Sequence, residues 1–215
     1  MVEKPGWTVL LIGGPSGVGK SIAARAIAQR FGLSWLQVDD LRLALQRSCV
    51  TLPEGTEGLY FFEQTPDVRR LPAEELRDGL IAVGVVLSPA IEVVVENHID
   101  QAAPVVIEGD GILPSLLVRA PVRARADDGR VRAIFVVEPD EQAILANIVA
   151  RGRGMAGWNE SEVRTDARAK WLYGQWLTTE ARRYGLPVLE PQPWETLIER
   201  MVMASGLSGS SRDAV

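Results

Sequence analysis

The sequence predicts an α/β fold with a five-stranded parallel sheet and helices on both of its faces. Short apolar runs rich in β-branched residues alternate along the chain with longer, helix-periodic segments. A glycine-rich loop follows the first apolar run, and acidic residues follow the second. At 215 residues, 47% hydrophobic and 24% charged, the chain can bury a substantial core without disulfides or metals.

Each expected element follows from a local pattern. The strands should be apolar runs bounded by turn residues, and the helices should be periodic segments bounded by capping residues. Gly32 is expected to end the first helix, and Ser88-Pro89 to separate two helices as the cap and first residue of the second. The expected strands are 7–12, 34–38, 104–107, 131–137 and 185–190. The expected helices are 22–31, one starting at 41, then 72–87, 88–99, 141–150, 160–184 and 195–204.

These elements predict a single domain over residues 1–204. Residues 41–102 would form a helical insert that binds substrate, and residues 151–170 a lid. Within the insert, residues 50–72 are irregular and carry three consecutive aromatic residues at 60–62, so they form either a substrate-binding segment or a packed surface loop. The Gly/Ser-rich residues 205–215 are expected to be disordered.

Charge and composition narrow the class of protein. A net charge of −5 argues against a broad nucleic-acid surface. We expect no apolar run of membrane-spanning length and no signal pattern. The single cysteine, Cys49, fits a reducing cytosol, so a cytoplasmic protein, monomeric or homodimeric, is expected.

The most specific pattern is G-x-x-x-x-G-K-[ST], which residues 14–21 match between an apolar strand and a helix. Glycines in this loop can adopt positive φ, so that backbone N–H groups point inward around an anion at the positive end of the helix. Lys20 should reach the β- and γ-phosphates of ATP, and the Ser21 hydroxyl should bind Mg²⁺. The expected phosphate-binding residues are Gly14, Pro15, Ser16, Gly17, Val18, Gly19, Lys20 and Ser21.

Asp39 and Asp40 follow the second strand, which we expect to lie beside the strand that carries the phosphate loop. The carboxyl ends of parallel strands are where open α/β sheets bind ligands. Either the two carboxylates simply cap the next helix, or at least one of them has a catalytic role. Arg42, within the same helix start, is a candidate contact to substrate.

Glu108 and Asp110 follow the third strand, in a segment similar to a Walker B motif, in which a carboxylate assists Mg²⁺. The usual pattern places Asp directly after the apolar residues, whereas here Glu108 has that position and Asp110 comes two residues later. Both are candidates for binding Mg²⁺, and Asp110 also for contacting substrate. The alternative is an ordinary acidic turn.

Arginines cluster in the expected lid. Arg151 and Arg153 lie among glycines at a helix end, and Arg164 and Arg168 are four residues apart on one helical face. Guanidinium groups match phosphate oxygens bidentately, so these side chains could close over phosphates. Alternatively, they form a solvated basic face with Arg–Glu surface pairs.

Arg69-Arg70 and His98 can each be interpreted as structural or as functional residues. Arg69-Arg70 is either a solvated charge pair or a contact to a substrate anion. His98, the one histidine, is expected to be a hydrogen-bonded structural residue, and a multi-histidine metal site is excluded by the count.

From residue 7 to residue 204 the chain resembles the P-loop small-molecule kinases, a group that includes the shikimate, gluconate and 2-phosphoglycerate kinases, chloramphenicol phosphotransferase and the zeta-toxin kinases. The resemblance implies a three-layer P-loop kinase fold with a helical lid. It also implies transfer of the γ-phosphoryl group of ATP to a hydroxyl of a small metabolite or antibiotic. In such kinases an Asp after the second strand contacts the acceptor hydroxyl and serves as base, and lid arginines bind phosphates. This implies Asp39 or Asp40 as base. The implied lid residues are Arg151 as catalytic, Arg153 at the nucleotide, and Arg164 and Arg168 at the substrate.

Two other functions stay open. The first is a nucleotide-binding ATPase or regulator without a small-molecule acceptor, and the second is a nucleoside or nucleotide kinase. A switch GTPase is disfavoured because the sequence contains no Asn-Lys-x-Asp guanine motif. The acceptor itself cannot be read from the sequence.

Overall fold

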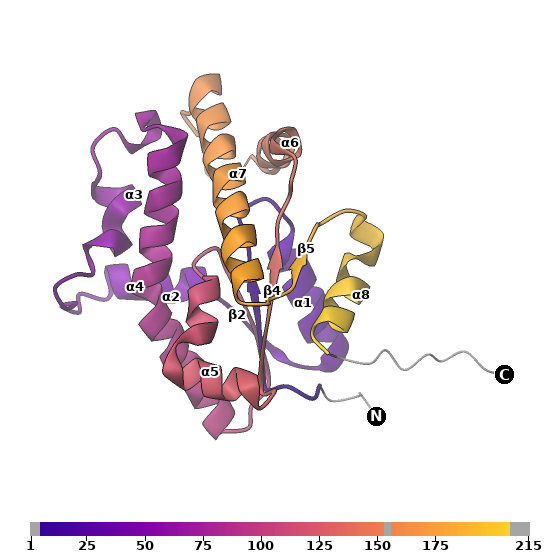
Figure 1. Cartoon of the computed structure of the whole chain (residues 1–215). Helices are drawn as coiled ribbons and strands as arrows, with labels where there is room; N and C mark the ends of the chain where they lie inside the picture. The colour runs from indigo at the N-terminus through magenta and orange to yellow at the C-terminus, as the bar shows by residue number, and fades with distance from the viewer. Residues whose placement is uncertain (1–4, 153–155, 207–215) are drawn as a thin grey trace.

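The computed structural model describes residues 5–152 and 156–206. Its centre is a five-stranded sheet with the order β2-β3-β1-β4-β5, in which every pair of neighbours is parallel (Figure 1). Leu11 in β1 lies opposite Ile107 of β3 and Ala133 of β4. The strands are β1 (Val9–Gly13), β2 (Ser34–Gln37), β3 (Val105–Glu108), β4 (Val131–Val136) and β5 (Val188–Leu189). The predicted α/β class with a five-stranded parallel sheet is confirmed.

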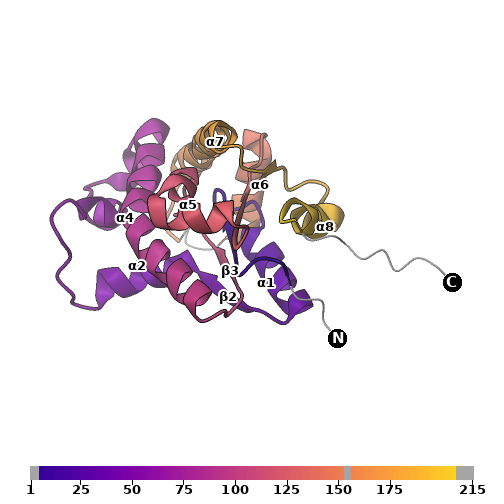
Figure 2. The same cartoon turned by 60° about the horizontal axis from the view of Figure 1, so that its bottom comes forward.

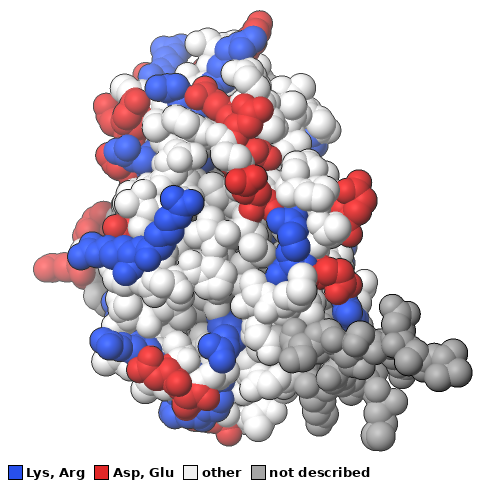
Figure 3. Space-filling view, turned by 45° about the vertical axis from the view of Figure 1, so that its right-hand side comes forward, with Lys and Arg blue, Asp and Glu red and all other residues white. Residues whose placement is uncertain are grey.

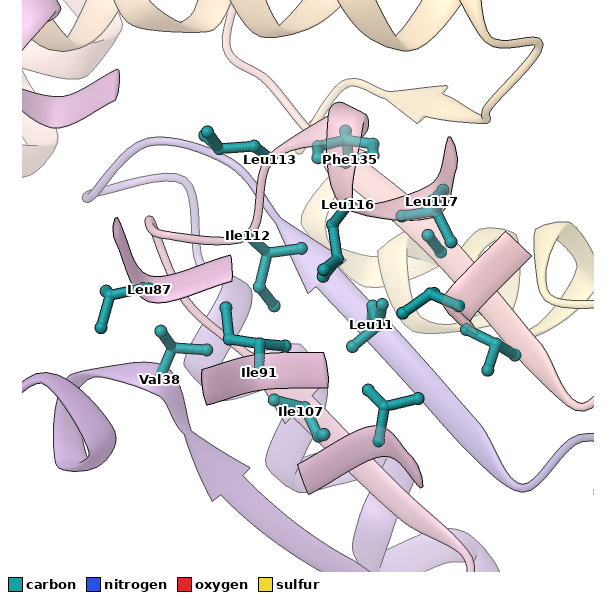
Figure 4. Packing of buried hydrophobic residues seen from close by; sticks show 14 of the residues in the cluster. Leu11, Val38, Leu87, Ile91, Ile107, Ile112, Leu113, Leu116, Leu117 and Phe135 are labelled. Atoms are coloured by element: carbon teal, nitrogen blue, oxygen red, sulfur yellow. The ribbon is translucent and has the colours of Figure 1, made fainter. Parts of the chain in front are cut away.

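Helices cover both faces of the sheet because its central strands are apolar on both sides. Val9 and Leu11 of β1 belong to one buried cluster, while Leu10 and Ile12 belong to another on the opposite face. Figure 4 shows side chains of the first cluster, with Leu11, Ile91 and Ile107 grouped together. The covering helices are α4 (Ala73–Asp100), α5 (Ala120–Asp127) and α7 (Glu160–Arg183) on the first face, and α1 (Lys20–Phe31) and α8 (Trp194–Ala204) on the second (Figure 2).

The predicted ends of α1 and α7 are confirmed. α1 ends at Gly32, which has a φ of 64° and whose N–H donates to carbonyls of the last turn. Asn159 accepts from the N–H of Glu162, and the Glu162 side chain accepts from the N–H of Asn159, so both halves of a capping box are formed.

Helix α4 corrects the sequence prediction. It is one helix of 28 residues that continues through Pro89, where two helices were expected. Leu87 and Ile91, on either side of Pro89, are both buried in the same cluster, and this packing outweighs the hydrogen bond that the proline ring removes. By length and composition α4 could cross a membrane, contrary to the expectation that no apolar run is long enough. In the fold, its buried apolar residues pack against the sheet and α7, whereas Val85 and Val93 are exposed.

The segment that precedes α4 is packed rather than open. Leu59 is buried, and the Phe61 ring lies against Gly79 of α4, where an added Cβ would meet it at 2.2 Å. The segment contains short helices that the sequence did not suggest. The remaining helices are α2 (Val38–Arg47), η1 (Glu57–Tyr60), α3 (Phe61–Gln64), η2 (Val68–Arg70), η3 (Pro114–Val118) and α6 (Glu141–Arg151).

Smaller corrections concern the last strand and the tail. β5 has only two residues, against six predicted, because it lies at the sheet edge and pairs with β4 alone. Ser205, predicted to be disordered, is buried after α8 and its hydroxyl donates to the carbonyl of Val202. The N–H of Gly206 donates to the carbonyl of Met203, and residues 207–215 of the predicted tail lie outside the described residues.

Candidate active site

A cleft of about 510 Å³ opens at the carboxyl ends of the strands. It brings together residues from the phosphate loop, the start of α2, the end of β3, α6 and α8. The candidates predicted from the sequence that line it are Ser16, Gly17, Gly19, Lys20, Ser21, Asp39, Asp40, Arg42, Glu108, Asp110 and Arg151. Segments far apart in the sequence therefore build one site.

The phosphate loop has the backbone that the sequence predicted. Gly14, Gly17 and Gly19 have φ values of 141°, 91° and 81°. At Gly14 an added Cβ would lie 2.1 Å from the carbonyl oxygen of Val136, so glycine is required both for its φ and for its space. Val18 is fully buried and anchors the loop in the core beside α1. The loop leads directly into the N-terminus of α1, where backbone N–H groups favour an anion.

Lys20 is held between two oxygens behind the loop. Its Nζ donates to the Pro15 carbonyl at 2.7 Å and to Asp110 Oδ1 at 2.8 Å, and only 5% of the side chain is exposed. The Ser16 hydroxyl donates to the other Asp110 oxygen at 2.7 Å. Burial raises the pKa of Asp110, but the Lys20 charge and the hydrogen bonds from Lys20 and Ser16 lower it more, so the net pKa is below its ordinary value. Asp110 is therefore an ionised partner of the lysine.

Glu108 faces a different group. Its Oε1 accepts from the Ser21 hydroxyl at 2.7 Å and from Gln37 Nε2 at 2.9 Å, and the side chain is almost fully buried. Glu108 and Asp110 thus have separate partners: the Glu108 carboxylate contacts Ser21 and Gln37, and the Asp110 carboxylate contacts Ser16 and Lys20.

Hydroxyl and carboxylate oxygens at Ser21 and Glu108 are the hard ligands that Mg²⁺ prefers. No group of three or more His, Cys, Asp or Glu residues that could hold a metal occurs in residues 5–152 and 156–206. Mg²⁺ is usually bound by one or two carboxylates together with substrate phosphates. The residues present therefore suit a magnesium ion that arrives with a nucleotide.

Asp39 and Asp40 lie in the first turn of α2 rather than in a loop after the strand. Gln37 is the N-cap, and neither aspartate makes a capping hydrogen bond, so the capping interpretation is wrong. The expectation that β2 lies beside β1 is also wrong, because β3 runs between them. Both aspartates nevertheless line the cleft, and Arg42 Nε lies 3.2 Å from Asp39 Oδ1.

Of the arginines in the predicted lid, some line the cleft and others do not. Arg151 ends α6 and lines the cleft, whereas Arg153 lies outside the described residues. Arg164 pairs with Glu160 at 2.7 Å and Arg168 with Glu141 at 3.1 Å, and neither lines the cleft. The structure thus places these two outside the site, because acidic side chains one turn away on α7 and on α6 engage them.

The remaining candidates have structural partners. His98 Nδ1 lies 2.8 Å from the carbonyl oxygen of Ala103, as expected for a hydrogen-bonded structural residue. The Arg69 guanidinium lies over the Trp158 ring, 5.0 Å from its centroid. Arg70 makes a 3.9 Å pair with Asp67.

Comparisons with known proteins agree with this architecture. No family model matches the chain. A curated 2-phosphoglycerate kinase from Methanothermobacter thermautotrophicus is 27% identical over 203 residues, which are 90% of this chain and 64% of that protein. The chain therefore spans less than two thirds of that relative. A shikimate kinase from Acinetobacter baumannii, solved in complex with shikimate, matches with a TM-score of 0.51 and 14% identity over 94% of this chain and 97% of that one.

The chain has the P-loop kinase fold. Several residues of the site were missed in the sequence, among them Gln37, which lines the cleft and donates to Glu108. Trp194, at the start of α8, lines the cleft. Its ring packs against Gly19 so closely that a Cβ added to Gly19 would lie 2.3 Å from a ring carbon. Asn147 of α6 donates to the carbonyl of Gly17 at 3.2 Å. Tyr173 of α7 donates its hydroxyl to the backbone carbonyl of Asp110. No local motif marks them, because only the tertiary packing brings these helices to the loop.

Proposed function

We propose that the protein is an ATP-dependent phosphotransferase that moves the γ-phosphoryl group of ATP to a hydroxyl of a small molecule. The observation that carries this proposal is the shared cleft, which is lined both by the glycine loop with Lys20 and by Asp39 and Asp40. Phosphoryl transfer needs mainly positioning and neutralisation of charge, and these residues can supply both.

In this proposal the nucleotide phosphates lie against the loop N–H groups and the N-terminus of α1. Lys20 exchanges its partners Asp110 and Pro15 for phosphate oxygens, which places its charge on the group that is transferred. Ser21 and Glu108 would hold Mg²⁺, which would supply neutralisation of phosphate charge. Arg151, at the rim of the cleft, adds a further cation.

Asp39 or Asp40 orients the acceptor hydroxyl and takes its proton. Arg42 lies beside Asp39 in the cleft and can contact an anionic group of the acceptor. Because the relative with 27% identity is named a 2-phosphoglycerate kinase, 2-phosphoglycerate is the first acceptor to test. The cations Arg42 and Arg151 suit an acceptor that carries a carboxylate or phosphate.

Trp194 supplies an aromatic surface for the nucleobase. Its side chain is 37% exposed, borders Gly19 and lines the same cleft. Stacking on a base is worth about 1–3 kcal/mol by alanine substitution. We therefore expect Trp194→Ala to weaken binding of ATP but not of inorganic tripolyphosphate, as measured by calorimetry. Equal weakening of both ligands would contradict the assignment, and Trp194→Phe is the matched control that keeps a ring.

The remaining expectations belong to the same proposal. Residues 41–102 form the substrate-binding insert and residues 151–170 the lid, within one domain over residues 1–204. The protein is cytoplasmic, monomeric or homodimeric, and does not bind nucleic acid or membranes. On the face shown in Figure 3, basic and acidic side chains are interleaved in small groups, which supports the expectation about nucleic acid.

The test is a transfer screen with ATP labelled in the γ-phosphate. Acceptors are 2-phosphoglycerate, other hydroxy acids, sugars, nucleosides and hydroxylated antibiotics, with Lys20→Ala as the control. We expect one acceptor to become labelled by the wild type and none by the variant. Steady ATP hydrolysis that no acceptor accelerates would favour an ATPase or regulator, and labelling of a nucleoside or nucleotide alone would favour a kinase of that class.

A further inference from the structure

Helix α7 contacts both of the residues that hold the phosphate-loop lysine. Lys20 Nζ lies between the carbonyl of Pro15 and the carboxylate of Asp110. Tyr173 donates its hydroxyl to the Asp110 carbonyl. The next residue, Gly174, packs on the loop: a Cβ there would lie 3.3 Å from Pro15 Cγ. Two consecutive residues of one helix thus support the two partners of Lys20.

Tyr173 is fixed in this position. It is fully buried, and its ring is stacked on Trp176 with the centroids 6.0 Å apart and the planes 12° apart. Burial, and then the Asp110 charge, raise the pKa of the Tyr173 hydroxyl well above its ordinary value, so it keeps the proton that it donates. One turn earlier, Lys170 pairs with Asp166 at 2.5 Å. The Lys170 charge also contributes to the lowered pKa of Asp110.

We propose that Tyr173 is a positioning residue that couples α7 to the phosphate loop. α7 begins at Glu160, so its first turns belong to the proposed lid, and it runs as one continuous helix past the loop (Figure 1). A displacement of its N-terminal half therefore moves Asp110 and Pro15 together and changes the position of Lys20. In the other direction, phosphates that draw Lys20 away from Asp110 change the position of Asp110, and with it the hydrogen bond that Asp110 accepts from Tyr173 of α7. The coupling rests on the proposed function only in requiring that a nucleotide binds the loop.

The direct test is amide hydrogen exchange of the full chain with and without ATP and Mg²⁺. In the wild type, we expect ATP to slow exchange both in the phosphate loop with α1 and in α7. In Tyr173→Phe, which removes one oxygen, the loop response should remain and the α7 response should be lost. Tyr184→Phe is the matched control, since its hydroxyl has no hydrogen-bond partner in the described part of the chain. It should behave as the wild type.

The outcomes separate the two proposals. No protection of the loop by ATP would overturn the proposed function, and the coupling with it. Loop protection with an unchanged α7 response in Tyr173→Phe, or with no α7 response in the wild type, would overturn the coupling alone. If Tyr173→Phe does not fold, Gly174→Ala takes its place, because its Cβ would lie 2.9 Å from Val137 Cγ1 and push α7 away from Pro15.

A double-mutant cycle with Tyr173→Phe and Asp110→Ala tests whether Tyr173 affects catalysis through Asp110. Once an acceptor is known, we expect Tyr173→Phe to lower kcat about tenfold while leaving the KM for the acceptor unchanged, because a small displacement of Lys20 affects the transition state most. In an Asp110→Ala background the same change should have little further effect. Independent, multiplicative effects, or a raised KM with normal kcat, would show that Tyr173 does not position Lys20 through Asp110.

Discussion

Asp39 and Asp40 are adjacent in sequence and share the cleft, yet their surroundings differ. Asp39 is paired with Arg42, whereas Asp40 has no ion-pair partner among the residues that the structure describes. We predict that replacing each by Asn will lower kcat about 10²-fold or more for one of them, the usual effect of losing a general base. Steady-state transfer rates decide this. Full activity in both variants would remove the base assignment.

The Lys20–Asp110 pair predicts how stability depends on pH. The pKa of Asp110 in the folded protein is below its ordinary value of 3.8. Its stabilising contribution is therefore fully present above the ordinary value and is lost as the pH falls through the lower, folded value. Urea unfolding between pH 2 and pH 7, a range set by ordinary carboxyl pKa values, should show a smaller acid loss in Asp110→Asn than in the wild type.

Asp127→Asn is the control for that experiment, because Asp127 is exposed and its contact with Arg123 is 3.8 Å. Its acid dependence should match the wild type. An Asp110→Asn variant with an unchanged acid transition would show that the Lys20–Asp110 pair contributes nothing to folding.

Helix α7 starts at a complete capping box, and this start is at the proposed lid. Removing the Asn159 side chain leaves a backbone N–H of the first turn without its partner. We predict that Asn159→Ala lowers the free energy of unfolding by about 1 kcal/mol. Denaturant titration measures it, with the exposed neighbour Ser161→Ala as control. Equal stability of the two variants would mean that the first turn of α7 does not contribute to the cooperative fold.

Elements with local causes were predicted well from the sequence. The phosphate loop, the stop at Gly32 and the capping box at Asn159 each depend on residues within one turn of the chain. Elements decided by packing were not. Pro89 indicated a helix boundary, but the buried face of α4 continues across it. Residues 112–129 contain η3 and α5, which carry no periodic pattern strong enough to identify them.

The candidate site divides in the same way. The loop residues and the carboxylates could be predicted because each directly follows an apolar strand in the sequence, and the carboxyl ends of parallel strands meet at one edge of the sheet. Two other contacts could not be predicted, since Gln37 reaches the Glu108 carboxylate and Tyr173 reaches the backbone carbonyl of Asp110 only through the tertiary fold. Arg164 and Arg168 were predicted to lie in the site but do not line it. They lie on the predicted helix, but they pair with Glu160 and Glu141 instead of reaching the cleft.

At the scale of the whole molecule, one parallel sheet brings a phosphate loop, two separately engaged carboxylates and a pair of aspartates to a single edge. The proposed function requires that this edge binds a nucleoside triphosphate. A ligand that binds only the folded state also stabilises it, so binding and thermal stability should change together.

Titration calorimetry with ATP in the presence of Mg²⁺ tests this most directly. We predict saturable binding of one ATP per chain in the wild type and its loss in Lys20→Ala, which removes the cation that meets the β- and γ-phosphates. The absence of a binding signal in a correctly folded wild type, or equal binding in Lys20→Ala, would contradict the account.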